Sequence, residues 1–493
     1  MEVDIILVVF AAILVFYVLV FVFLRRLNEL QSFVKLGRKV YQALPPGDMG
    51  WPLIGSSLSL YNTFKSSNDP NTFINHLISK KEKTGIYRSH LFGKPTIIVT
   101  DPEICRRIYL DDECFVPKYP KGAEIFVGSG SAMKIADHKS VHRLMAAPIS
   151  GAQALSKYVG YIEKEVVKCL EEWSSMSEPI ELLNETKTLY FKLISRIFLG
   201  AEVRGPCLQE LEKLFREMTL ALVSIFPFDL PGFAYNRAFK AMKEVEKILN
   251  KIIEEKRKAV EKYEEREENC EIEAMIEASD GNGAKLLSNN AIIDILLGVL
   301  HAGNHTVAHA AIWVLIHISD HPHVLQQAKE EQELIIKERP PTQNGLNFGE
   351  ITRMTYLTKV INETLRRSTL TSPTFREAKS NVKIKGYIIP KGWSIQIWNG
   401  AVHMDPQIYP NPHKFDPSRW DNYKPKAGAF IPFGMGRVYC PGSELVKLEM
   451  AILLHHFLLL NYRMERVNPK CQLTHMSSPA PLDNCLVKII KHS

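Results

Sequence analysis

The sequence is poor in the features that mark disulfide scaffolds, zinc clusters and repeat proteins. Its 493 residues include only 8 cysteines, and no two of them form a C-x-x-C pair. This excludes a disulfide framework, argues against thiolate zinc clusters and fits a reducing compartment. Gly (27) and Pro (28) are near average usage, which excludes collagen-like and low-complexity designs. No tandem repeat of solenoid or propeller length occurs.

Several common catalytic motifs are also absent. The chain has no G-x-x-x-x-G-K-[ST] phosphate loop and no G-x-S-x-G nucleophile elbow. Gly434-x-Gly436 lacks the third glycine of a dinucleotide fingerprint. H-E-x-x-H is missing, although His301, His305 and His309 recur at i, i+4 and i+8 on one helix face. Three ligands on one helix cannot easily surround a tetrahedral ion, so a histidine-stripe metalloenzyme is only an alternative.

The composition is that of a folded protein. Hydrophobic residues make up 46% of the chain and charged residues 23%, which excludes wholesale disorder. The formal net charge is a mild +7, and we expect no nucleic-acid partner from it.

The amino-terminal region predicts a membrane anchor. The run from Ile5 to Leu24 contains no charge, and a helix of this length spans about 30 Å, the thickness of a hydrocarbon core. Its start is acidic, unlike a signal peptide, and basic residues such as Arg25 and Arg26 follow it. The positive-inside rule then predicts a single-pass anchor in the endoplasmic reticulum membrane, with the amino terminus lumenal and the catalytic domain cytosolic. A buried core helix is the alternative.

The rest of the chain predicts one large, mainly α domain. The pattern is helical almost throughout residues 150–335, whereas Asn381 to Trp398 alternates with β character. We therefore expect an anchor at 1–26, a basic, proline-rich hinge at 27–50, and a catalytic domain at 51–493. The loop 225–233 contains three Phe and either packs on the core or dips into the membrane.

One segment predicts metal chemistry. In Phe433-Gly434-Met435-Gly436-Arg437-Val438-Tyr439-Cys440-Pro441-Gly442, a lone Cys ends a glycine-rich turn before a helix-like stretch. Glycines let a backbone approach a flat cofactor closely. Amides at a helix start favour a thiolate and lower its pKa. These residues predict a thiolate metal ligand at Cys440, with a structural cysteine as the alternative.

This segment, F-x-x-G-x-x-x-C-x-G, resembles the haem-binding signature of the cytochrome P450 family. The resemblance implies a P450 fold and haem b (iron protoporphyrin IX) with Cys440 as the axial iron ligand. It also implies cofactor contacts from Phe433, Gly436, Arg437 and Gly442.

Three further parts of the family pattern occur in order. Glu363-Thr364-Leu365-Arg366 resembles the E-x-x-R motif, and Phe415 to Trp420 resembles the P-x-R element that follows it. The resemblance implies a structural lock of Glu363, Arg366 and Arg419. Ala302 to Thr306 resembles the oxygen-activating motif, and implies a groove over the haem at Gly303 and catalytic roles for His305 and Thr306.

The chain departs from the family pattern at several positions. His305 stands where an acidic residue is usual, and we expect a neutral imidazole with a pKa near 6.5 to shuttle protons there. Val438 stands two residues before the Cys, where Arg is usual, and the basic residue is displaced by one position to Arg437. Further candidates for contact with the cofactor are His138 and His142, which stand for Trp and Arg of a W-x-x-x-R helix, with Arg143 and Arg376. These changes motivate a second alternative, a degenerate haem-binding scaffold with little turnover.

Softer signals indicate a plant group within the family. The segments Pro45 to Gly55, Phe375 to Ala378 and Tyr387 to Trp393 resemble the group that contains ent-kaurenoic acid oxidase and β-amyrin 11-oxidase. This resemblance implies a polycyclic terpenoid substrate. The altered motif at His305 favours a triterpenoid, such as a cucurbitadienol- or β-amyrin-type scaffold, over ent-kaurenoic acid oxidation in gibberellin biosynthesis.

The family resemblance also implies the partners. We expect O₂, a hydrophobic terpenoid, membrane lipid, and electrons from an NADPH–cytochrome P450 reductase. Substrate contacts are expected from the 120–136 loop, from Leu297 to Thr306 and from Leu370 to Thr374.

Overall fold

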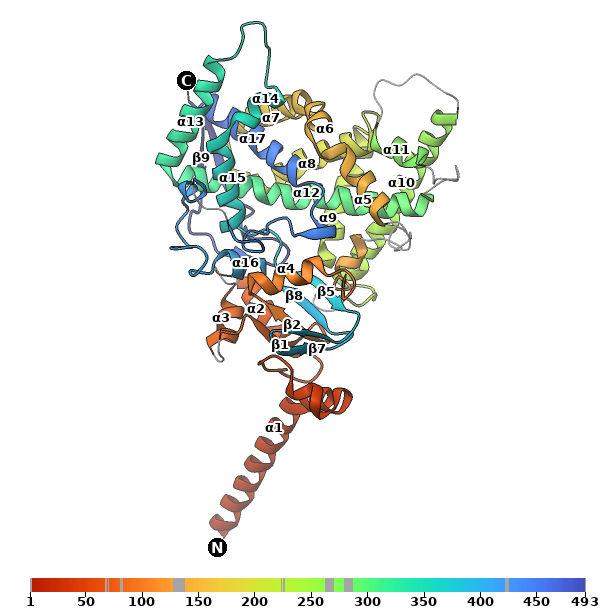
Figure 1. Cartoon of the computed structure of the whole chain (residues 1–493), viewed down its shortest axis with the longest axis vertical. Helices are drawn as coiled ribbons and strands as arrows, with labels where there is room; N and C mark the ends of the chain where they lie inside the picture. The colour runs from red at the N-terminus through yellow and green to blue at the C-terminus, as the bar shows by residue number, and fades with distance from the viewer. Residues whose placement is uncertain are drawn as a thin grey trace.

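Helices dominate the structure. This computed structural model describes residues 2–66, 69, 71–79, 83–126, 138–222, 224, 227–261, 270–278, 287–421 and 425–492. The strands of this part of the chain form four small sheets. Figure 1 shows the helices gathered in the upper body, the largest sheet below them, and the amino-terminal helix projecting away. The predicted fold class, mainly α with a small β region, is confirmed.

The largest sheet joins an early part of the chain, residues 86–117, to a late part, residues 374–397. It has the strand order β1-β2-β8-β5-β3, and β2 pairs with β8 in parallel. The apolar centre of β2, Ile97 and Ile98, is fully buried. The strands are β1 (Ile86–Leu91), β2 (Lys94–Val99), β3 (Phe115–Pro117), β5 (Thr374–Ala378) and β8 (Ser394–Ile397).

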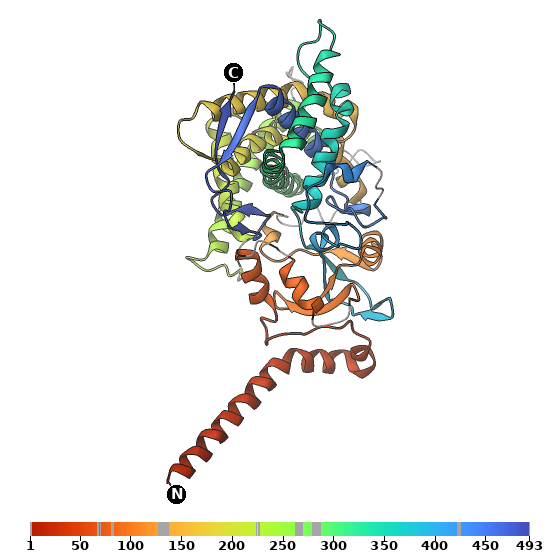
Figure 2. The ribbon, with the colours of Figure 1, turned by 90° about the vertical axis from the view of Figure 1, so that its left-hand side faces the viewer.

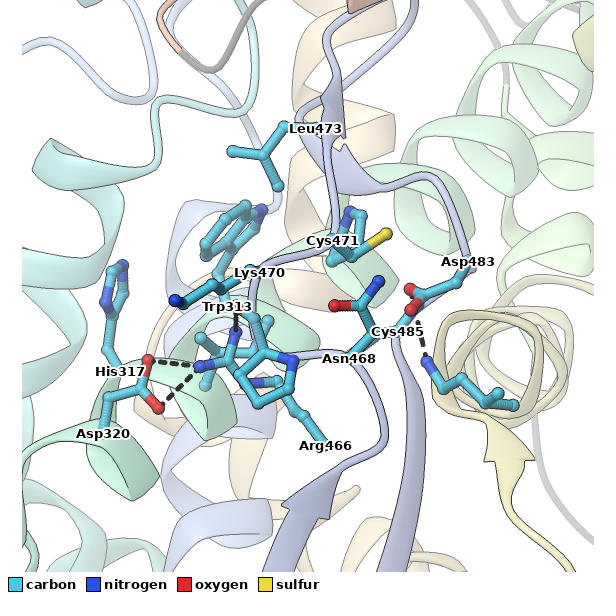
Figure 3. Close-up of a pocket in the computed structure, with 14 residues that line it drawn as sticks. Trp313, His317, Asp320, Arg466, Asn468, Lys470, Cys471, Leu473, Asp483 and Cys485 are labelled. Atoms are coloured by element: carbon cyan, nitrogen blue, oxygen red, sulfur yellow. Dashed lines mark hydrogen bonds and ion pairs between the residues drawn. The ribbon is translucent and has the colours of Figure 1, made fainter.

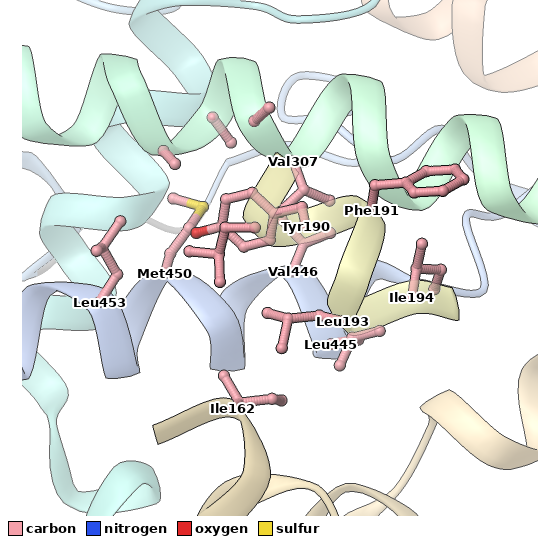
Figure 4. Packing of buried hydrophobic residues seen from close by; sticks show 14 of the residues in the cluster. Ile162, Tyr190, Phe191, Leu193, Ile194, Val307, Leu445, Val446, Met450 and Leu453 are labelled. Carbon is pink, nitrogen blue, oxygen red and sulfur yellow. The ribbon is translucent and has the colours of Figure 1, made fainter. Parts of the chain in front are cut away.

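A long apolar helix, α12 (Asn289–Asp320), runs through the middle of the body and is seen nearly end-on in Figure 2. Ser288 caps its start by accepting a hydrogen bond from the Ala291 backbone N–H at 3.3 Å. It packs against α8 (Leu182–Leu199), α15 (Thr355–Arg367) and α17 (Ser443–Leu459). Figure 4 shows Val307 of α12 among side chains of α8 and α17, including Tyr190 and Val446.

The other elements surround this centre. The other α-helices of the described chain are α2 (Ser57–Ser66), α3 (Thr72–Ser79), α4 (Pro102–Leu110), α5 (His138–Ala146), α6 (Ala152–Ser156), α7 (Val159–Ser175), α9 (Pro206–Met218), α10 (Ala234–Glu261), α11 (Glu271–Glu277), α13 (Pro322–Lys337), α14 (Phe348–Arg353) and α16 (Asn399–His403). The smaller sheets hold β4 (Ile180–Glu181), β6 (Val382–Ile384), β7 (Tyr387–Ile389), β9 (Tyr462–Arg466), β10 (Leu473–Thr474), β11 (Ala480–Pro481) and β12 (Leu486–Lys491).

The amino-terminal helix, α1 (Glu2–Gln42), projects from the body in both ribbon views. Its backbone leaves helical geometry at Gly37, with φ 74° and ψ 160°. The segment 27–50, expected to be a hinge, is therefore helical up to Gln42 apart from that break. Of the helices whose side chains are described throughout, α12 alone is long and apolar enough to cross a membrane, and 67% of its most apolar window is buried, as in a core helix.

Gly303 lies where α12 packs closely on α8. A Cβ built on Gly303 would lie 2.6 Å from Cγ1 of Ile194 in α8, so this face of α12 is turned toward α8. The expected groove over the haem at Gly303 stays a prediction. Its lack of a side chain lets two helices approach closely, because any Cβ there would meet the neighbouring helix.

Substituting Gly303 tests this close approach. Gly303→Ala should lower the free energy of unfolding by about 1–3 kcal/mol, because the added methyl overpacks the contact with Ile194. Denaturant unfolding measures the loss. Gly160→Ala in α7 is the matched control, since a Cβ there meets nothing within 4 Å, and it should cause no loss. Equal stability of the two variants would contradict the close packing of α8 on α12.

Candidate active site

The turn that carries Cys440, hereafter the Cys turn (residues 431–442), is closed by its own backbone. The Cys440 N–H donates to the Phe433 carbonyl oxygen at 2.9 Å, and the Gly434 N–H donates to Ile431 O at 3.3 Å. Gly434 and Gly436 have φ of 71° and 68°, which glycine adopts without strain. A Cβ on Gly436 would lie 2.8 Å from the Tyr109 carbonyl oxygen. The turn therefore needs glycine at this position both for its backbone angle and for the approach of α4.

The thiol of Cys440 is held at the start of α17. Burial raises the pKa of this thiol, and a hydrogen bond from the Gly442 backbone N–H acts in the opposite direction but less strongly. The expectation of a lowered thiol pKa is therefore wrong for the protein chain by itself, because desolvation outweighs the helix-start amides. A bound metal cation supplies the missing opposite charge and deprotonates a coordinating thiol.

A buried ion pair lies behind this turn. Glu363 and Arg366 of α15 have fully buried side chains, and Arg366 Nη2 lies 2.7 Å from Glu363 Oε1. Arg366 Nε donates to the other carboxylate oxygen at 2.9 Å. Arg419 Nε lies farther away, 3.5 Å from Glu363 Oε1. Sequence reasoning did not assign a role to Trp420, whose Nε1–H donates to Glu363 Oε2 at 3.1 Å.

Arg366 also binds the chain that leads to the Cys turn. Its Nη1 donates to His403 O at 2.9 Å and its Nη2 donates to Pro412 O at 2.9 Å. The guanidinium thus satisfies carbonyls that would otherwise be buried without partners. The structure brings Glu363, Arg366 and Arg419 together. The ion pair also forms hydrogen bonds with the backbone of residues 403–416.

One face of α12 is not buried although the helix crosses the middle of the body. Val299 and His301 are half-buried, Ala302 is exposed, and Thr306 is half-buried. Because helical neighbours at i and i+4 share a face, Ala302 and Thr306 form a row that the surrounding side chains leave partly open. The Thr306 hydroxyl donates to the Ala302 carbonyl oxygen at 2.7 Å, so its oxygen keeps lone pairs free.

His305 lies on another face of α12 and is 6% exposed. Neither ring nitrogen has a hydrogen-bond partner among the described residues. Burial, with smaller effects of His309 and His301, lowers the pKa of His305 well below its ordinary value. The expected pKa near 6.5 is therefore wrong, because burial disfavours the protonated imidazole, and a role for His305 in proton transfer stays a prediction.

The histidine stripe does not form a metal site in the part of the chain that the structure describes. The rings of His301 and His305 stack with centroids 5.2 Å apart, and those of His305 and His309 are 4.4 Å apart. His301 also stacks on Phe126 at 3.6 Å. No group of three or more described His, Cys, Asp or Glu side chains is placed to hold a metal ion.

The residues expected to bind the cofactor carboxylates differ in their burial and in their contacts. Arg376 is buried, its Nη1 donates to Phe375 O at 2.8 Å, and its Nη2 has no partner among the described residues. His142 Nε2 lies 3.2 Å from Tyr439 O, so its ring contacts the Cys turn. Arg143 and Arg437 are exposed. The side chain of His138 lies outside the described residues, as do residues 127–136 of the loop expected to contact substrate.

Sequence reasoning missed a polar network beside Arg376. The Tyr109 hydroxyl lies 2.5 Å from Thr374 Oγ1 and donates to Asn399 Oδ1 at 3.3 Å. The Arg376 guanidinium lies over the Tyr109 ring at 5.1 Å. These residues belong to α4, β5 and the start of α16, and no motif or spacing in the sequence links them.

The pocket at the other end of α12 is separate from this site. A cavity of about 480 Å³ is lined by residues that include Trp313, Asp320 and Arg466, and by none of the residues predicted to bind the cofactor. Figure 3 shows Arg466 bound to both carboxylate oxygens of Asp320, each at 2.8 Å. The ion pair neutralises both charges at the rim.

The residues around Cys440 fit a haem group. A thiol sits at the end of a glycine turn whose backbone can approach a flat ring, and the buried guanidinium of Arg376 has a donor without a partner, as a cofactor carboxylate requires. Cys440 would be the axial ligand, and Arg376 would hold a propionate.

Breaking the buried ion pair should destabilise the protein. Glu363→Gln should lower the free energy of unfolding by about 3–5 kcal/mol, because Arg366 is left as an uncompensated buried charge. Glu338→Gln is the control, since its pair with Arg353 is more than half exposed on both sides and should contribute only about 0–1 kcal/mol. Urea unfolding compares the two, and similar small losses would contradict a supporting role for the buried pair.

Comparisons with known proteins agree with this site. The cytochrome P450 family model matches residues 45–483. The chain is 44% identical to 7,8-epoxymelianol synthase of Ailanthus altissima, over 96% of this chain and 95% of that protein. It is 44% identical to beta-amyrin 11-oxidase of Glycyrrhiza uralensis, over 98% of each chain. It is also 44% identical to ent-kaurenoic acid oxidase 2 of Arabidopsis thaliana, over 95% of this chain and 94% of that protein.

A solved structure shows the same fold. A cyanobacterial cytochrome P450 with retinoic acid bound matches with a TM-score of 0.79 at 24% identity, and the match covers 91% of this chain and 99% of that one. The family, predicted from the Cys440 motif and its companions, and the plant group, predicted from the segments at 45–55, 375–378 and 387–393, are confirmed. The glycine turn, the buried ion pair and these matches lead to one conclusion: the chain belongs to the cytochrome P450 family, and it is a monooxygenase whose cofactor is haem.

Proposed function

We propose that this enzyme is a membrane-bound monooxygenase that oxidises a neutral triterpenoid, of the β-amyrin or cucurbitadienol type, with O₂ and electrons from an NADPH–cytochrome P450 reductase. The observation that carries the substrate class is the uncharged, partly exposed face of α12 beside Thr306. The relatives named as synthases and oxidases of terpenoids support the same class.

Two of the segments expected to contact substrate favour a substrate without charge. No residue from Leu297 to Thr306 or from Leu370 to Thr374 is Asp, Glu, Lys or Arg, whereas the described part of the third expected segment, residues 120–126, includes Lys121 and Glu124. Burial lowers the pKa of His301 to about 3, so its imidazole is neutral near pH 7. A carboxylate bound against Leu297 to Thr306 and Leu370 to Thr374 would lose its hydration without meeting a cation from either segment, which costs several kcal/mol. This disfavours ent-kaurenoic acid, a carboxylic acid, as the substrate.

The side chains then have separate roles. Bound haem supplies O₂ activation and O–O cleavage, which thiolate ligation favours. Cys440 provides the thiolate and Arg376 orients a propionate. To pass a proton into the cavity, the Thr306 hydroxyl must turn away from Ala302 O, with which it forms a 2.7 Å hydrogen bond. His305 does not serve as a charged donor, because its ring is buried and neutral.

The anchor proposal rests on α1. The described apolar side chains between Phe10 and Leu24 are exposed, and exposed apolar surface of this length fits the hydrocarbon core. The carboxy-terminal half of this segment contacts the body of the protein. The ring centroids of Phe21 and Trp51 are 4.7 Å apart, and Asn28 Nδ2 donates to Met49 O at 3.0 Å. We propose insertion in the endoplasmic reticulum membrane, with residues 1–26 as the anchor and the catalytic domain cytosolic.

The loop 227–233 supports a second membrane contact. Phe228, Leu230 and Phe233 are exposed, so they do not pack on the core. Residues 225 and 226 lie outside the described part of the chain. We propose that the exposed side chains of this loop enter the headgroup region of the membrane.

The first test combines spectroscopy with product analysis. Reduced microsomes should show the carbon-monoxide band of thiolate-ligated haem, and Cys440→Ala should abolish it. With reductase and NADPH, triterpene alcohols should give oxygenated products and a substrate-dependent spectral shift. Ent-kaurenoic acid should give neither. Turnover of ent-kaurenoic acid alone would overturn the neutral-substrate proposal, and an intact spectrum with no turnover of any terpene would indicate a degenerate scaffold.

The second test concerns topology. In sealed microsomes, an amino-terminal epitope tag should be protected from added protease, whereas a carboxy-terminal tag should be digested. Two charges at the helix centre, Leu14→Arg and Phe16→Arg, should release the protein into the soluble fraction, because each buried Arg costs about 2.5–3.5 kcal/mol in insertion. Digestion of both tags in the parent protein would show that α1 does not span the membrane.

A further inference from the structure

His403, the last residue of α16, belongs to none of the motifs that led to the site. Its side chain is fully buried, and its ring lies against Phe430 with centroids 5.6 Å apart. It stands between the buried ion pair and the Cys turn, and its ring forms one hydrogen bond toward each.

The bonds of His403 have a fixed direction. The Ile431 backbone N–H donates to His403 Nε2 at 3.0 Å, so Nε2 carries no proton. Nδ1 therefore holds the proton and donates to Thr369 Oγ1 at 2.8 Å, and the Thr369 hydroxyl donates to Arg366 O at 3.1 Å. The Arg366 guanidinium in turn donates to His403 O at 2.9 Å. The ring is the only described side chain that accepts the Ile431 N–H.

This arrangement requires a neutral imidazole. A proton on Nε2 would point at the N–H of Ile431, and the Arg366 cation is already hydrogen-bonded to the carbonyl oxygen of the same residue. Burial, and then the charge of Arg366, lower the pKa of His403 to about 3. The tautomer is therefore constant across the physiological range, and the ring is a rigid connector rather than a titrating group.

Ile431 is the first residue of the Cys turn. Its carbonyl oxygen accepts the N–H of Gly434 at 3.3 Å, so a shift of the Ile431 peptide moves the hydrogen bond that shapes the turn. The segment just before it is held by a second contact, the Tyr409 hydroxyl donating to Ala429 O at 3.0 Å. Among the described residues, the His403 side chain thus links the end of α15, through Thr369, to the first residue of the turn.

We propose that His403 is a positioning residue: it transmits the geometry of the Glu363–Arg366 pair to the Ile431 peptide and so holds the Cys turn where Cys440 can ligate the haem iron. The inference concerns haem retention and ligation, and it does not depend on which terpenoid is oxidised.

Three variants separate the two bonds of the ring. In His403→Gln the side-chain oxygen reaches the place of Nε2 and can accept the Ile431 N–H. In His403→Asn the shorter amide reaches only the place of Nδ1 and Thr369. His403→Leu makes neither bond but keeps much of the volume. His413→Leu is the matched control, since His413 is exposed in the same stretch of chain.

The readouts are spectroscopic and do not require substrate. Haem transfer from the purified full-length protein to apomyoglobin gives the rate of haem loss, and the reduced carbon-monoxide spectrum gives the fraction with an intact thiolate ligand. The Leu and Asn variants should lose haem roughly tenfold faster than the parent, which is the effect of one unsatisfied buried N–H. A smaller fraction of their haem should show the spectrum of an intact thiolate ligand. Gln and the His413→Leu control should stay within about twofold of the parent.

The outcomes decide the proposal. Unchanged haem loss and spectrum in His403→Asn and His403→Leu would overturn it. Equal impairment of the Gln and Asn variants would also overturn it, because the role would then be packing rather than acceptance of the Ile431 N–H. If His403→Leu does not accumulate, the comparison of Gln with Asn decides alone, since both amides are similar in polarity and differ in which bond they restore.

Discussion

The arrangement around Cys440 depends on one buried ion pair. Glu363 and Arg366 lie three residues apart on α15 with no exposed side-chain surface, and two charges in that position are tolerated only when their remaining hydrogen bonds are satisfied. Here the partners are the backbone of residues 403–416 and the Trp420 indole. The pair therefore organises the irregular chain between α16 and Pro417, and this chain precedes the Cys turn in the sequence.

The second constraint is the passage of α12 through the middle of the body. Gly303 lets α8 approach on one side, and the row of Ala302 and Thr306 remains open on another. One helix serves both purposes because neighbouring residues are rotated by about 100° around its axis and therefore face different surroundings. This explains why His305, adjacent to Thr306 in sequence, is buried on another face and cannot titrate near pH 7.

Much of the fold class and the positions of the chemical motifs could be predicted from the sequence. The glycine turn, E-x-x-R and the later Arg419 are local sequence patterns, and each can be recognised without knowing where the fold places it. Side-chain environments could not be predicted in the same way. The pKa of Cys440 was expected to fall because helix-start amides are visible in sequence, whereas the burial that raises it comes from distant elements. The network of Tyr109, Thr374 and Asn399 likewise joins three elements without any shared spacing.

By itself, the sequence determined the family, the haem ligand candidate, the mainly helical architecture and the apolar run of α1. These follow from residue type, short spacing and periodicity, which are properties of one segment at a time. Only the tertiary structure decided that Gly303 faces α8, that His142 contacts the Cys turn at Tyr439 O, and that the His403 ring must carry its proton on Nδ1. The physical reason is that burial and hydrogen-bond direction are set by partners far away in the chain, and a residue cannot reveal them before those partners are in place.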